Sequence, residues 1–179
     1  RRGASIERDY GRRLAAKECW MMPDAYLREQ LLQLLRGENA HATFDDVVNN
    51  FPLAHVGVRP GGAPHSPWEL LEHMRISQYD IVRFSQDPGY VSPKWPDEYW
   101  PRQQAPSSER EWRKSTESFR RDRKEFEQLI LDPGRDLYEP FPWGDGQTLL
   151  REALVLADHT AYHLGQLMQL RRALEKKPD

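Results

Sequence analysis

The sequence predicts an all-α protein, a four-helix bundle with one short extra helix. Apolar residues recur at helical spacing in four long segments, at about 24–36, 66–86, 108–131 and 148–174. No period-2 strand pattern of useful length and no internal repeat occurs. Some of the connections are long, and residues 87–107 form the longest. Helices joined in this way are typical of a bundle with a crossover connection.

The last helix is the segment around which the chain is organised. At about 100° per residue, its apolar positions share one broad arc: Leu149, Leu150, Ala153, Leu156, Ala157, Leu164, Leu167, Met168 and Leu170. His159 and His163 are four residues apart and therefore stack on one face, at the edge of that arc. Two imidazoles placed in this way can hold one metal ion between them.

Capping residues mark where the other helices begin. At the start of the second long segment, Ser66 is the N-cap, Pro67 takes the first helical position and Glu69 completes a capping box. Ser108 with Glu111 predicts a second capping box, and Thr148 is a plausible N-cap for the last helix. Similar reasoning predicts a short helix after Thr43, with Asp45 and Asp46 in its first turn and Phe44, Val47 and Val48 facing inward.

Residues 87–107 are rich in proline and aromatic residues, and such a long connection usually has a purpose. Fully extended, a segment of this length could span about 70 Å, whereas the helix before it is about 30 Å long. The connection can therefore cross the bundle and let the next helix run parallel to the previous one. We expect Tyr90, Trp95, Tyr99 and Trp100 to pin it against the helices.

Composition limits the class of protein. The chain has 179 residues, 38% of them apolar and 30% charged, with a net charge of −2. This near-neutral charge offers no field for nucleic acid or an acidic membrane, and no apolar run is long enough to span a bilayer. A single cysteine, Cys19, excludes an internal disulfide and fits a cytoplasmic location.

The domain organisation expected is an N-terminal extension over residues 1–21 and one helical domain over 22–179. The extension is basic, weakly periodic and followed by Met21 and Met22, either of which could be a natural start. A genuine N-terminal helix is the alternative.

The residues alone leave the role of the histidines open. His73 lies at the core edge of its own helix and is the best third metal ligand beside His159 and His163. The three could equally be partly buried, hydrogen-bonded core residues. His41, His55 and His65 lie in loops or at helix ends, and His55 and His65 could line a mouth. An HEXXH metalloprotease motif is absent, because Thr160 follows His159 where a Glu is required; neither a GxSxG elbow nor a Gly-rich phosphate loop occurs.

Two segments, SPWELLEHMRISQYDIV at 66–82 and DHTAYHLGQLMQLRR at 158–172, resemble the DinB-like superfamily of damage-inducible proteins. The similarity covers roughly residues 22–174, and HxxxHxGQ with an upstream helical histidine is its most specific part. YWP at 99–101 and PWGDGQTL at 142–149 are similar to loops of one subgroup. The resemblance implies a bundle of up-down-down-up topology.

The same resemblance implies a three-histidine site for a divalent metal such as Zn, Ni or Fe at His73, His159 and His163. Some relatives are metal-dependent enzymes that use low-molecular-weight thiols, which implies a transferase or, failing that, a hydrolase acting on a small molecule. A stress-linked metal-binding or interaction protein without turnover is the alternative. A homodimer would be the commonest oligomer.

Three further side chains are candidates for supporting contacts. Glu69, one turn before His73, could accept its second ring N–H, although its capping role competes. Gln166 could bond a bound water or a substrate, or simply pack. Glu152 lies about 10 Å from His159 along the axis and would reach only a substrate. Asp158 and Tyr162 are expected to turn away from this line.

Overall fold

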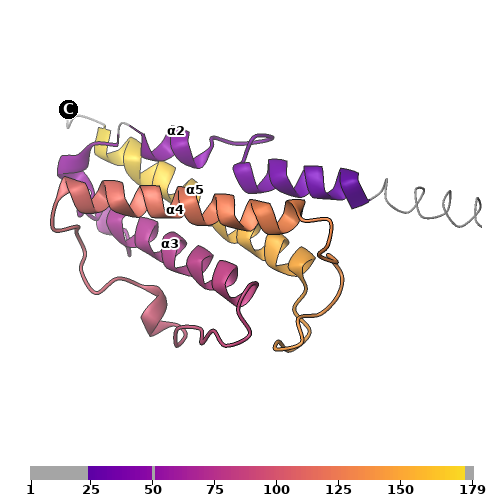
Figure 1. Ribbon diagram of the computed structural model, residues 1–179. Coiled ribbons are helices and arrows are strands. Elements are labelled where there is room, and N and C mark those ends of the chain that lie inside the picture. Colours follow the sequence, from indigo (N-terminus) through magenta and orange to yellow (C-terminus); the bar gives the residue numbers. More distant parts are fainter. Residues whose placement is uncertain (1–23, 50, 176–179) are drawn as a thin grey trace, which may run out of the picture.

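The structure is a computed structural model that describes residues 24–49 and 51–175, and it confirms the all-α bundle (Figure 1). A helix over residues 24–36 is followed by the short α2 (Phe44–Val48) and by three long helices. These are α3 (Pro67–Phe84), α4 (Glu109–Leu131) and α5 (Leu149–Glu175). Single 3-10 turns, η1 (Leu53–His55), η2 (Pro60–Gly62) and η3 (Asp97–Tyr99), interrupt the loops. Within these ranges there is no strand, and no helix is long and apolar enough to cross a membrane.

The helices begin where capping residues predict. The hydroxyls of Thr43 and Ser66 accept from the third backbone N–H of α2 and α3, and both capping boxes are complete. Ser108 caps α4, but the carboxylate of Glu111 accepts from the N–H of Ser107 rather than from that of Ser108. The box predicted there is therefore only half formed.

Polar contacts fix the directions of the long helices. The Ser66 hydroxyl, at the start of α3, donates to the Gln104 carbonyl just before α4, at 2.6 Å. Near the other end of both helices, Arg83 pairs with Glu125. Thus α3 and α4 run the same way, and the connection between them returns along the bundle (Figure 1).

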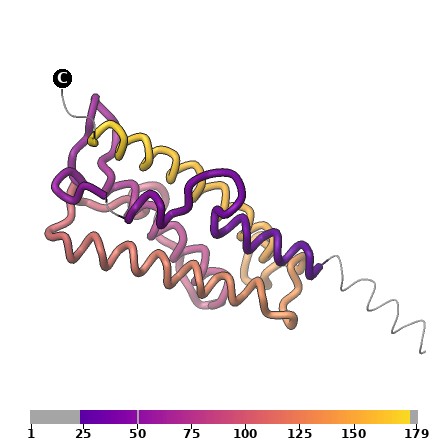
Figure 2. The backbone as a smooth tube through the Cα atoms, turned by 90° about the horizontal axis from the view of Figure 1, so that it is seen from above, coloured from indigo at the N-terminus to yellow at the C-terminus, as the bar shows by residue number. Residues whose placement is uncertain are grey.

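The helix at 24–36 and α2 follow one another along the length of the bundle (Figures 1 and 2). Two arginines dock them. The Arg28 guanidinium donates to three carbonyls around the end of α4, those of Ile130, Asp132 and Arg135. Near the end of α5, Arg171 Nη1 donates to three carbonyls at the end of α2.

Two apolar clusters form the core, one toward each end of the bundle. One joins the helix at 24–36 to the C-terminal halves of α3 and α4 and the N-terminal half of α5. The other joins α2 to the opposite halves of these three helices. Of the arc predicted for α5, six residues are buried, namely Leu149, Ala153, Leu156, Ala157, Leu164 and Leu167.

Three of the four aromatic residues expected to hold the crossover connection do so, and one of them, Tyr90, meets the Tyr79 ring of α3 edge-on. Tyr99 donates from its hydroxyl to the Asp80 carboxylate of α3 at 2.6 Å, and Trp100 packs against the core. Trp95 is 72% exposed, so the expectation that it pins the loop to the helices is wrong. Its ring contacts the Tyr99 ring, with centroids 5.3 Å apart, where the chain turns through η3. The extension expected over residues 1–21 lies outside the described residues.

Candidate metal centre

Three histidines from two antiparallel helices meet beside the crossover connection. His73 projects from α3 and is buried, while His159 and His163 project from successive turns of α5. The Nε2 atoms of His73 and His159 are 3.0 Å apart. One ring nitrogen from each of the three histidines can be chosen so that all lie within 4.8 Å of one another.

The second ring nitrogens of two histidines are held by acceptors. His73 Nδ1 lies 2.9 Å from the Tyr99 carbonyl oxygen, and His163 Nδ1 lies 2.8 Å from Gln166 Oε1. Both acceptors favour the tautomer that carries hydrogen on Nδ1, which leaves the Nε2 lone pair free. Metal-binding histidines are usually oriented in this way. His159 Nδ1 is buried and has no partner among the described residues.

An aromatic stack covers one side of the cluster. The Trp100 ring lies on the His73 ring with centroids 3.9 Å apart and planes within 1°. His65 lies on the other face of Trp100, at 4.0 Å. The Tyr162 ring meets His163 edge-on at 4.8 Å. Two aromatic side chains and one loop histidine therefore shield the cluster from solvent.

The electrostatics of the cluster favour neutral imidazoles. Burial lowers the pKa of His73 and that of His163. For His159, burial and the two neighbouring imidazoles lower the pKa to about 4. All three rings are thus uncharged at neutral pH, the form in which histidine coordinates metal.

The spacing of His73 and His159 suits a borderline divalent ion. Two nitrogens that each lie about 2.0–2.1 Å from a tetrahedral ion are about 3.3 Å apart, close to the His73–His159 spacing. Three imidazoles suit Zn, Ni or Fe and leave at least one coordination position for another ligand. The cluster could therefore hold such an ion.

Other predicted side chains take different places. The Glu69 carboxylate does not reach His73, because it completes the α3 cap and pairs with Arg59. The Tyr99 carbonyl, rather than Glu69, is the acceptor that faces the second ring nitrogen of His73. Glu152 is buried and paired with Arg151, and burial raises its pKa. His55 is exposed in η1.

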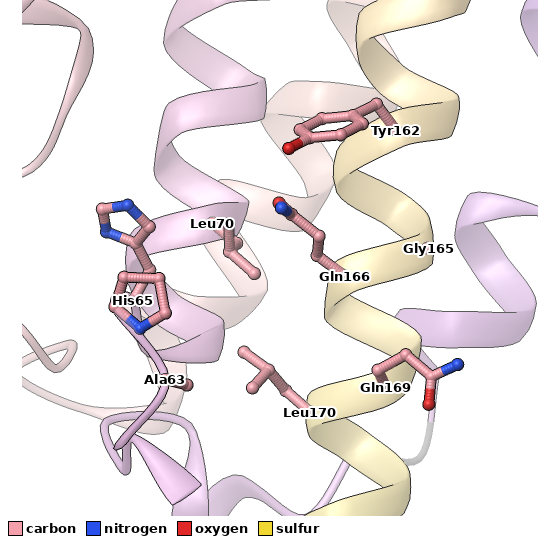
Figure 3. A pocket seen from close by; sticks show the side chains of 9 residues that line it. Ala63, His65, Leu70, Tyr162, Gly165, Gln166, Gln169 and Leu170 are labelled. Carbon is pink, nitrogen blue, oxygen red and sulfur yellow. The ribbon is translucent and has the colours of Figure 1, made fainter. Parts of the chain in front are cut away.

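A pocket of about 500 Å³ adjoins the cluster (Figure 3). Its lining comprises Ala63, Pro64, His65, Leu70, Tyr162, Gly165, Gln166, Gln169 and Leu170. The three clustered histidines are not among these residues, but Gln166 and Tyr162 touch His163 and also line the pocket. Access to the cluster from this side therefore passes these two side chains.

Sequence reasoning missed three contributors to the site. Tyr162 was expected to turn away, yet its ring borders both His163 and the pocket. Its position four residues before Gln166, on the same face of α5, could have suggested this. The Tyr99 carbonyl and the Trp100 ring depend on the path of the crossover connection, which the helical pattern does not specify.

Comparison with known proteins agrees with this architecture. The family model of the DinB superfamily matches residues 36–167, which include all three histidines. No curated protein and no solved structure matches the chain. The chain belongs to the DinB superfamily, as the motif around His159 and His163 predicted.

Proposed function

We propose that His73, His159 and His163 bind one divalent metal ion, and that the protein is a metal-dependent enzyme that transfers a small thiol to an electrophile. One observation carries this proposal: three neutral imidazoles converge beside a pocket of about 500 Å³. A bound divalent ion would supply Lewis acidity that lowers the pKa of a thiol or of a water molecule. In the transfer, the S–H proton leaves to solvent, the sulfur bonds to the electrophilic carbon, and the leaving group departs with its electron pair.

The chain's own residues would position the reactants. The Tyr99 carbonyl and Gln166 hold two imidazoles in one orientation. Trp100 excludes water from one face of His73. The pocket next to Tyr162 would receive the electrophile, and the scarcity of disulfide-forming cysteines suits a cytoplasmic setting in which small thiols are abundant.

Metal binding is tested by elemental analysis of untagged protein. We expect about one ion per chain in the wild type and in His55→Ala, which changes an exposed histidine outside the cluster. His159→Ala should lose at least about 100-fold in affinity, more than is typical for loss of an outer contact. Equal metal content in wild type and His159→Ala would refute the site.

A non-catalytic metal protein is the second candidate, favoured by the near-complete burial of His73 (2% exposed) under Trp100. The cobalt(II) form separates the two proposals. If the site is open, mercaptoethanol or glutathione should change its visible spectrum, and the loaded protein should couple a thiol to a chromogenic chloronitroarene. An unchanged spectrum with no turnover for any thiol would favour the non-catalytic protein.

A further inference from the structure

The pocket beside α5 has an uncharged wall. Its nine lining residues include no Asp, Glu, Lys or Arg, and most of its lining surface is apolar. The polar groups that it offers come from His65, Tyr162, Gln166 and Gln169. Because transfer of an unpaired charge into such surroundings is costly, the wall disfavours a charged ligand body.

Gly165 keeps one side of this pocket open. It lies inside the long helix α5, where glycine costs about 1 kcal/mol relative to alanine. Its backbone is not in the left-handed region, and a Cβ at this position would meet no atom within 4 Å. Neither backbone conformation nor packing requires glycine here. What the missing side chain leaves free is space at the pocket wall.

Gln166 presents hydrogen-bond donors to the same space. Its Oε1 lies 2.8 Å from His163 Nδ1, so the NH₂ group of the same amide is not used by His163. In Figure 3 this amide lies between α5 and Leu70 of α3, within the pocket. The Tyr162 hydroxyl is directed across the pocket from the next turn of α5. A ligand here therefore meets donors that face an apolar wall.

We propose that this pocket binds an uncharged, largely apolar small molecule through an accepting oxygen, such as a carbonyl, held by the Gln166 amide. This proposal assigns a chemical class to the electrophile. It rests on the proposed function, which puts the reacting thiol at the histidine cluster. The amide that holds the ligand oxygen also orients His163, so it sets the ligand's place relative to the cluster.

The pocket is tested with metal-free, full-length protein, so that no ion can attract a carboxylate. The probes are matched pairs of aryl amides and aryl carboxylates, such as cinnamamide and cinnamate. Binding is measured by NMR from the backbone N–H of Gly165 and the side-chain NH₂ of Gln166. We expect the amides to bind at least about tenfold more tightly than the acids, which corresponds to about 1.4 kcal/mol.

Three variants assign the contacts. Gly165→Leu should place a side chain in the pocket beside Gln166 and weaken amide binding at least about tenfold, while it leaves the metal content unchanged. Gln166→Glu keeps an acceptor for His163 but loses the NH₂ donor, and should weaken the amides about tenfold. Gln169→Glu adds the same charge to the pocket at a residue that does not bond His163. It serves as the control for Gln166→Glu.

The outcomes separate the two proposals. Acids that bind as tightly as amides, amide affinity that is unchanged in Gly165→Leu, or no amide that perturbs these signals would overturn the substrate class. A wild-type protein that binds amides in this pattern yet takes up no metal would overturn the proposed function alone.

Discussion

The buried carboxyl group of Glu152 affects the stability of the folded protein in a pH-dependent way. Glu152 is 4% exposed and has Arg151 as its ion-pair partner. Burial is the main cause of its raised pKa, and Asp80 adds to it. The folded protein therefore binds this proton more tightly than the unfolded chain, so the contribution of Glu152 to stability falls as pH rises through the folded pKa.

Replacing this carboxylate should relieve that cost. At pH 7 we expect Glu152→Gln to be at least as stable as the wild type, with the difference disappearing near pH 4, where both forms are neutral. Urea unfolding between pH 4 and pH 8 measures this. Glu139→Gln, at an exposed position, is the control and should shift stability by no more than about 0.5 kcal/mol. A larger loss in Glu152→Gln than in the control at pH 7 would contradict the argument.

The depressed histidine pKa values also have a measurable consequence. Since the pKa of each ring is lowered from the ordinary 6.5, an ion that binds near pH 6.5 should displace few protons. Calorimetry in buffers of different ionisation enthalpy counts these protons, and we expect fewer than about one per ion. Because the pKa of His159 is about 4, protons should compete with the ion for this ring only in more acidic buffer. Release of about 1.5 protons at pH 6.5, the number that three histidines with the ordinary pKa would give, would contradict the lowered pKa values.

At the scale of elements, arginine side chains join helices through carbonyl groups. Arg28 is 9% exposed and satisfies three carbonyls at the end of α4. The planar guanidinium can reach them together, whereas an ammonium group cannot match this fork. Loss of Arg28 would leave the buried Ile130 carbonyl without this donor, whereas the Asp132 carbonyl would still accept from the Arg135 N–H.

We expect Arg28→Ala to lower the free energy of unfolding by about 1–3 kcal/mol, the cost of one unsatisfied buried acceptor. Arg28→Lys should fall between this variant and the wild type. Denaturant titration provides the measurement, with the exposed Arg110→Ala in α4 as control. If Arg28→Ala unfolds at the same denaturant concentration as Arg110→Ala, the docking role is refuted.

Helices were predictable from the sequence because their determinants are local. The caps at Ser66 and Thr43 require only residues three positions apart. The histidine cluster could be predicted as far as its three members, since helical spacing places His159 and His163 on one face. Its orientation could not, because the Tyr99 carbonyl and the Trp100 ring arrive from a loop whose path depends on the finished bundle.

Across the whole molecule, the crossover connection joins the topology to the candidate metal centre. The same segment that returns the chain from the end of α3 to the start of α4 (Figure 1) places the Trp100 ring over that of His73. Trp100 also packs against one of the two core clusters. One side chain therefore contributes both to the shielding of the site and to the packing of the bundle.

Trp100→Ala should affect both properties. We expect a loss of about 2 kcal/mol in stability, less than for a fully buried tryptophan, and at least about tenfold faster removal of bound metal by a chelator. Stopped-flow absorbance with a chromogenic chelator measures the release. Trp95→Ala, on the same connection but 72% exposed, should leave both quantities unchanged. Equal release rates for the two variants would show that Trp100 does not shield the site.

The acceptor for His73 is a main-chain oxygen, and this has an evolutionary consequence. No side-chain substitution at position 99 can delete that oxygen, so the interaction is insulated from point mutation there. Insertion or deletion within residues 87–107 would move it. Variation in the length of this segment, rather than in its amino acids, would then change the orientation of His73 in evolution. A comparison of aligned residue identities alone would not reveal such a change.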